Sequence, residues 1–267
     1  MQNNSFFRFQ YLFAAAVVAC SLALGALVMG ALVDGPHRAE AADAFPKSKK
    51  EKSGHIITER VSLPEFDALE VSSAIDIILT QGDYPGYVEV SIAENMRDYL
   101  NLQVEDGKLT AGYKNFRGNN KDKTEIKISV PAIYEMTATS ASSIKTIGSF
   151  AIDKALAITA TSAADINIGE ITGESLVIEA TSAADVYALV VDVDRLYATA
   201  TSAADIKLRG LNVGTVSATA TSAADITLSG RCNHSSVYSN SGGDISTRGL
   251  IREKLPIKRA YATNSPE

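Results

Sequence analysis

ATSAADI, at residues 160–166, is the stretch that decides the fold, because it recurs almost letter for letter along the chain. The copies start at residues 138, 160, 180, 200, 220 and 239, so they follow one another at steps of 22, 20, 20, 20 and 19 residues. A fixed period of this length is typical of a solenoid, in which each repeat is one unit stacked on its neighbours. The repeat therefore predicts a single stacked domain whose coils occupy residues 137–253.

Apolar and polar residues alternate on both sides of the phrase, which is the pattern of β-strands. In the copy from Leu156 to Ile168, apolar or small residues occupy every second position up to Ala160 and again from Ile166. We expect two strands that meet at a corner, a third short segment near Ile171, and parallel pairing of successive coils about 4.8 Å apart. Stacking then builds three inward ladders: Ile166, Val186, Ile206, Ile226 and Ile245; Leu176, Leu196 and Val216; and Ala160, Ala180, Ala200 and Ala220. The predicted fold class is all-β.

Residues 56–136 precede the clear repeats and contain several β signals, so we expect a β-rich part that begins and caps the solenoid. Val71–Ile77 is a degenerate copy of the phrase and should form the first coil. A hairpin is expected around Asp106–Gly107, because an Asp-Gly pair supplies the positive φ that a tight turn requires. Further expected elements are a short helix at 94–99 and strands at 87–92 and 124–130.

Four segments carry a resemblance to a known family: FDALEVSSAIDIILTQGD (66–83), YVEVSIAEN (87–95), LQVEDGKLTAGY (102–113) and EIKISVPAIYEMTATSASSI (125–144). Their order and spacing, continued by the recurring phrase, resemble the bacterial auto-transporter adhesin, head GIN domain family over roughly residues 60–250. The resemblance implies a right-handed parallel β-helix at the cell surface or in the envelope. It also implies an adhesin-like role, with no established catalytic residues.

The chain departs from the family pattern at the tight turn, where the family typically has Gly-Ser-Gly. Four copies carry Ser-Ala-Ala instead, beginning with Ser162–Ala164, and only Gly242–Gly243 restores glycine. Positive φ is costly for residues that have a Cβ. The departure therefore predicts turns without left-handed residues, or a gentler corner.

The N-terminus predicts export from the cytoplasm. Tyr11–Val33 contains no charged residue and is long enough for a membrane span. Two small-residue cleavage patterns follow, Ala39–Ala41 and Ala42–Ala44. Residues 1–44 are therefore expected to be a cleaved signal peptide or a retained anchor helix, and Val17–Cys20 also fits a lipoprotein cleavage box.

Each of these alternatives places the rest of the chain outside the cytoplasm, in the periplasm or at the cell surface. Membrane association is expected through residues 11–33 where this segment is not cleaved. Residues 45–55 are a basic linker that suits a solvated tether. Residues 254–267 are a polar C-terminal tail.

Composition narrows the classes of function. The chain of 267 residues has a formal net charge of −6, without the basic stripe of a nucleic-acid binder. Its two cysteines, Cys20 and Cys232, exclude a disulfide-stapled fold, and Cys232 is interpreted as a small buried filler. The histidines, His37, His55 and His234, are too scattered for a metal site. No catalytic triad or phosphate-binding loop is found, so we expect neither an enzyme nor a cofactor.

Five aspartates recur at one position of the repeat: Asp165, Asp185, Asp205, Asp225 and Asp244. Parallel stacking would place their carboxylates about 5 Å apart. Three interpretations stay open: each Asp bonds backbone amides of its own turn, the row binds Ca²⁺, or neighbouring acids cleave a polysaccharide. Catalysis is disfavoured because it needs two carboxyl groups with different pKa values, whereas repetition gives similar surroundings.

Threonines form a second candidate surface on the outside: Thr159, Thr161, Thr199, Thr201, Thr219 and Thr221. Glu179 interrupts this array. Flat threonine arrays on β-helices can bind ice, and β-branched Thr also simply suits an exposed strand.

Together these features predict an exported β-helix that works as an adhesin-like binding module without catalysis. The partner class is left open between a glycan and a protein, and the oligomeric state is left open as well. The rival functions are a polysaccharide lyase or hydrolase that uses the aspartate row, and a purely structural rod.

Overall fold

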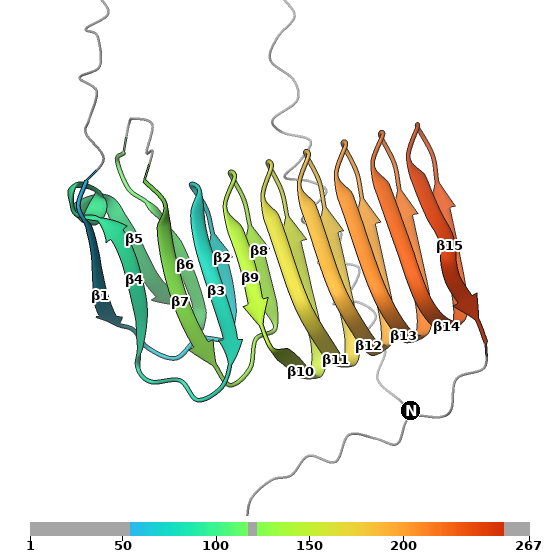
Figure 1. The fold of residues 1–267 in the computed structure, drawn as a ribbon, viewed down its shortest axis with the longest axis horizontal. Coiled ribbons are helices and arrows are strands. Elements are labelled where there is room, and N and C mark those ends of the chain that lie inside the picture. Colours follow the sequence, from blue (N-terminus) through green and yellow to red (C-terminus); the bar gives the residue numbers. More distant parts are fainter. Residues whose placement is uncertain (1–53, 117–121, 254–267) are drawn as a thin grey trace, which may run out of the picture. The chain divides into compact units, whose positions relative to one another are not determined.

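The computed structural model describes residues 54–116 and 122–253, and the expected N-terminal helix and C-terminal tail lie outside them. The described chain is all-β, as predicted, with 70% of its residues in strands and a β-solenoid of about six turns (Figure 1). It includes a 3₁₀ helix, η1 (Glu94–Tyr99), at the place where a short helix was expected. No helix in the described part is long and apolar enough to cross a membrane.

Within residues 54–116 and 122–253, fifteen strands form one continuous sheet. They are β1 (Ile56–Ser62), β2 (Ala68–Val71), β3 (Ile75–Gln81), β4 (Tyr87–Ala93), β5 (Leu100–Glu105), β6 (Lys108–Tyr113), β7 (Thr124–Val130), β8 (Glu135–Ala138), β9 (Ser143–Ile147), β10 (Ser149–Ala160), β11 (Asp165–Ala180), β12 (Asp185–Ala200), β13 (Asp205–Ala220), β14 (Asp225–Ser239) and β15 (Asp244–Arg252).

Strands β10 to β15 belong to the successive coils of the repeat, and Figure 1 shows them side by side in chain order. β11 pairs in parallel with β10 on one side and with β12 on the other. The third segment predicted near Ile171 is part of the same long strand. Buried side chains change from a spacing of two residues to three between Ile168 and Ile171, where the coil turns. The spacing changes again further along, where consecutive buried residues are Ser175 and Leu176 in β11 and Val213 and Val216 in β13. Each coil therefore has one tight corner and two gradual bends, and its outward residues lie on three faces.

The predicted inward ladders are confirmed. Ile166 lies opposite Val186, and the row continues through Ile206 and Ile226 to Ile245. The first four are at most 1% exposed, whereas the last, on β15, is only partly buried. The leucine and alanine ladders are in register and buried in the same way. Because each buried aliphatic side chain contributes roughly 1.5–3 kcal/mol, this thin core depends on uninterrupted rows.

Ile206→Asp should lower the free energy of unfolding by more than about 4 kcal/mol, because it buries a charge without a partner. Ile206 is fully buried and lies between Val186 and Ile226. The control is Thr227→Asp, at an exposed position opposite Lys207, where we expect a change within about 0.5 kcal/mol. Urea unfolding followed by circular dichroism measures both, and similar losses in the two variants would contradict the assigned core.

The tight corner differs from the expectation based on sequence. Ser162 and Ala163 have φ values of 56° and 58°, and the next three copies of the phrase repeat these values closely. Both central residues are thus left-handed, as in the two-residue turns that usually contain glycine or asparagine. The prediction of turns without left-handed residues was wrong.

Backbone hydrogen bonds between coils hold the corner in this conformation. The amide of Ala163 donates to the carbonyl of Ser182 at 3.0 Å, and the following corners repeat the bond to the next coil. The amide of Asp185 donates to the carbonyl of Ala164 at 2.9 Å. A left-handed residue with a Cβ costs about 1–2 kcal/mol. The corner tolerates this cost because its backbone groups are paired with the neighbouring coils.

Ala203→Gly should raise the free energy of unfolding by about 1 kcal/mol, because glycine adopts the φ of 59° found there without a Cβ penalty. Ala204→Gly is the matched control at the next position, which is fully buried and does not have a positive φ. This second change should lower stability by roughly 1 kcal/mol. Denaturant midpoints that move in the same direction for both variants would refute this account of the corner.

Residues 56–136 contain the expected elements in an unexpected spatial order. Ser73 and Ala74 form a corner of the same left-handed type, with φ values of 64° and 57°, so the degenerate copy does begin a coil. This coil is not at the end of the stack, because β2 lies between β6 and β8, and β3 lies between β7 and β9. Beyond it, β1 pairs with β4, β4 with β7 and β5 with β6, each in antiparallel orientation. The β5–β6 hairpin turns at Asp106–Gly107, as predicted.

Candidate binding surface

Every coil turns three sets of side chains outward, and the two that flank the tight corner carry the predicted rows. We call the side that carries the aspartates, on the first halves of β11 to β15, the acidic face. The face on the other side of the tight corner is the threonine face, formed by the outward residues of 157–161, 177–181, 197–201, 217–221 and 236–240.

The five predicted aspartates lie in one row, because adjacent strands pair Asp with Asp at this position from β11 to β15. Four of them are exposed, and Asp205 is partly buried. The row continues through Ser143 to Asp76, whose Oδ1 accepts a hydrogen bond from Ser143 Oγ at 2.6 Å. Sequence reasoning missed Asp76 as a member of the row, although it occupies the Asp position of the degenerate copy.

The carboxylates do not bond their own turns. The backbone amides of all five aspartates donate to carbonyls of the preceding coil, as the amide of Asp185 does to Ala164. Among the described residues, one hydrogen bond reaches any of the five carboxylates: Lys207 Nζ lies 2.9 Å from Asp205 Oδ2. The interpretation that each side chain bonds its own turn was therefore wrong, and the row is a line of acids that faces solvent.

Stacking explains the electrostatics of the row. Burial raises the pKa of Asp185, the like charges of Asp205 and Asp165 raise it further, and Lys207 lowers it. The hydrogen bond to Asp205 and the charge of that carboxylate raise the pKa of Lys207. Within the described ranges, no group of three or more His, Cys, Asp or Glu side chains is placed to hold a metal ion. The Ca²⁺ candidates in this row remain a prediction from the sequence.

The threonine face carries two rows of outward hydroxyl groups. Thr159 and Thr199 lie on either side of Glu179, and the row continues through Thr219 to Tyr238 on β14. The second row lies at the corner and consists of Thr161, Thr181, Thr201 and Thr221, the last of which donates from Oγ1 to Thr201 Oγ1 at 3.1 Å. The six threonines predicted as an outward surface thus share one face.

Glu179 is the single charged residue in the five segments that define the threonine face. Its neighbours in the row are hydroxyl groups rather than cations. Burial raises the pKa of its carboxyl group, because the surroundings disfavour the ionised form. The folded state therefore holds this proton more tightly than the unfolded chain does.

Glu179→Gln should raise the free energy of unfolding at pH 7, because it removes a charge that folding desolvates. When folding raises the pKa of a carboxyl group, the folded state is less stable at pH values at which the unfolded chain has lost that proton. This cost disappears as the pH falls below the ordinary pKa range of a glutamate. The gain should therefore vanish in acid. Glu174→Gln is the control, because Glu174 pairs with Arg195 and its loss should not stabilise the protein. Unfolding curves across pH that show no gain at pH 7 would contradict the assignment.

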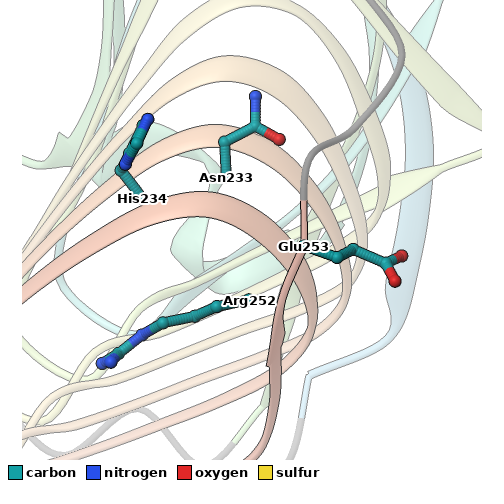
Figure 2. A pocket seen from close by; sticks show the side chains of 4 residues that line it. All are labelled: Asn233, His234, Arg252 and Glu253. Carbon is teal, nitrogen blue, oxygen red and sulfur yellow. The ribbon is translucent and has the colours of Figure 1, made fainter.

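A shallow pocket lies at the C-terminal end of the stack, with a volume of about 460 Å³. Asn233 and His234 line it from β14, and Arg252 and Glu253 line it from the end of β15. Figure 2 shows that these four side chains point in different directions rather than toward one point. The pocket arises because the described pairing of β14 with β15 stops at Arg252, so the second half of β14 has a partner strand on one side only.

Cys232 lies next to this pocket, and its surroundings support the prediction that it is a small buried filler of the core. The side chain is fully buried, in register with Val213 of the core. Burial raises the pKa of the thiol, which outweighs the opposite effects of Arg252 and of a hydrogen bond with Ser235. A raised pKa leaves little thiolate, which agrees with a packing role for this cysteine.

Comparison with solved structures supports the architecture. A crystal structure called a putative adhesin from Bacteroides fragilis shares 16% identity with the chain, covers 74% of it and 97% of its own length, and has a TM-score of 0.61. A second one, from Parabacteroides distasonis, shares 15% identity over 75% of this chain and 95% of its own, with a TM-score of 0.59. At such identities the likeness concerns the fold. No curated protein sequence matches the chain.

Sequence comparison with protein families gives a direct match. The family described as "Putative auto-transporter adhesin, head GIN domain" matches residues 65–262, which include all the repeat coils. The chain therefore belongs to the auto-transporter adhesin, head GIN domain family.

Proposed function

We propose that this protein is an adhesin-like binding module at the cell surface or in the cell envelope, and that it acts without catalysis. Membership of an adhesin family supports the binding role, and the family description suggests a surface or extracytoplasmic location. The observation that carries the proposal is the threonine face: a regular β-surface on five neighbouring strands with one carboxylate in it.

A flat and almost uncharged face suits contact with an extended partner. Sites for small molecules are usually concave, whereas this face consists of adjacent strands in one register. Backbone hydrogen bonds hold the outward side chains in place, which reduces the ordering cost of binding. Each threonine hydroxyl both donates and accepts hydrogen bonds, so the face can pair with either kind of polar group.

The acidic face supports the absence of catalysis. General acid and general base chemistry by two carboxyl groups requires surroundings that move their pKa values apart. The aspartates from β11 to β15 instead occupy the same position of the same phrase, and the difference at Asp205 comes from Lys207, which is not part of the phrase. A polysaccharide-cleaving function for this row would need an asymmetry that the repeat does not supply.

Thr219→Lys in the full chain should weaken capture of the partner surface by at least about tenfold, because it places a charge in the centre of the threonine face. Thr227→Lys is the matched control: it makes the same change on the neighbouring strand β14, but on the acidic face. Cells that display the wild-type chain or either variant are compared for attachment to panels of immobilised glycans, extracellular-matrix proteins and host-cell surfaces.

Attachment that is lost with Thr219→Lys and kept with Thr227→Lys supports the proposal. Attachment that depends on Thr227 alone would place the binding function on the acidic face. Turnover of a bound polysaccharide, abolished by a single Asp→Asn change in the aspartate row, would favour the enzyme instead.

A further inference from the structure

We propose that Tyr197 and Tyr238, together with the hydroxyl groups between them, form a platform for an extended, uncharged polysaccharide. This inference rests on the proposed function, because it names the ligand class and the contact residues of the threonine face. It assigns the specificity of the face to two side chains that depart from the repeat.

The two tyrosines lie on the same face, two coils apart. Tyr197 on β12 is in register with Ser217 on β13 and Ser236 on β14, and Tyr238 stands two residues further along β14. Neighbouring strands are about 4.8 Å apart and each residue advances about 3.3 Å along a strand, so the two tyrosines lie roughly 12 Å apart on a diagonal across the strands. A separation of this size is comparable to one disaccharide unit of an extended chain.

Both rings are open to solvent, and Tyr238 lies on the half of β14 that has a partner strand on one side only. Tyr197 is 36% exposed, and Tyr238 is 58% exposed. The hydroxyl of Tyr238 accepts a hydrogen bond from Asn240 Nδ2 at 3.3 Å, which leaves the face of the ring unobstructed by that contact. Exposed aromatic rings offer an apolar surface with an electron-rich face, to which the C–H bonds of a pyranose ring are attracted.

Hydroxyl groups fill the space between the rings. Ser217, Ser236, Thr199 and Thr219 all point outward there, and among the described residues none of these hydroxyls has a protein hydrogen-bond partner. Each can therefore donate to and accept from a ligand hydroxyl. A sugar chain alternates apolar C–H surfaces with hydroxyl groups. The tyrosine rings can cover the C–H surfaces, and the serine and threonine hydroxyls between the rings can bond the sugar hydroxyls.

The charge of the face favours a neutral ligand. The segments around the two tyrosines, 197–201, 217–221 and 236–240, contain no Asp, Glu, Lys or Arg. The nearest cation along β12 is Arg195, which is paired with Glu174. Arg252 at the end of the stack donates from Nε to Ser235 Oγ at 2.6 Å, beside Ser236. The three segments themselves offer no cation to an acidic polysaccharide, and the carboxylate of Glu179 in the adjacent coil would repel it.

The regular repeat around the tyrosines sets the direction of the ligand. β12, β13 and β14 keep one register from residue 195 to residue 200 and in the segments opposite, so the platform continues without interruption along the solenoid axis. A chain that covers both rings must cross the strands rather than follow one of them. Binding should therefore strengthen with ligand length until the oligosaccharide reaches from one ring to the other.

The test is calorimetric titration of the full chain in detergent with neutral β-linked gluco- and xylo-oligosaccharides of increasing length. Tyr197→Ala and Tyr238→Ala should each weaken binding of the longer oligosaccharides by about tenfold. Tyr197→Phe should retain most of the affinity, because the ring is kept. Tyr187→Ala is the matched control: it removes a tyrosine from the same strand on the acidic face and should leave binding unchanged.

Circular dichroism and the thermal midpoint show whether each variant is folded, so a loss of binding is read only from folded protein. Equal affinities for the wild type and both alanine variants would overturn the platform. Failure of all neutral oligosaccharides, with attachment to another surface still sensitive to Thr219→Lys, would overturn the platform while the proposed function stands. Absence of any attachment by the wild type would overturn both.

Discussion

The hydrogen bonds between the backbones of successive corners are the interaction on which the rest of the structure depends. Each Ser-Ala turn holds two left-handed residues that have a Cβ, and an amide of one corner is paired with a carbonyl of the next. This pairing fixes the register of neighbouring coils. Because side chains alternate with a period of two, a slip of one residue would turn every inward aliphatic outward. The corner therefore determines which ladders form and which faces are exposed.

A fixed register has opposite consequences on the acidic face and on the threonine face. On the acidic face it brings like charges together, and these charges add to the effect of burial in raising the pKa of Asp185. On the threonine face it brings hydroxyl groups together at little electrostatic cost, and the departures from the repeat become distinctive. Glu179, Tyr197 and Tyr238 are such departures. Function in a repeat protein is expected where the repeat is broken, since a uniform surface cannot by itself define one site.

Much of the fold could be predicted from the spacing of one phrase. The ladder that includes Ile166 and Ile206, the hairpin at Asp106–Gly107 and the coil that starts near Val71 were all predicted from the sequence and are found in the structure. The geometry of the corner was predicted wrongly, because the local preference of Ser and Ala against positive φ is overridden by hydrogen bonds to other coils. Local propensity cannot report a bond whose partner lies a full coil away.

The sequence by itself determined that the protein is a β-solenoid, which residues point inward, and that acids and threonines recur at fixed positions. These properties depend on periodicity, and periodicity is a local quantity. The tertiary structure alone decided that the coil of β2 and β3 is inserted between later strands, that the carboxylates face solvent, and that Tyr197 and Tyr238 share one open face. These properties depend on which strands become neighbours in space, and a one-dimensional pattern does not specify that.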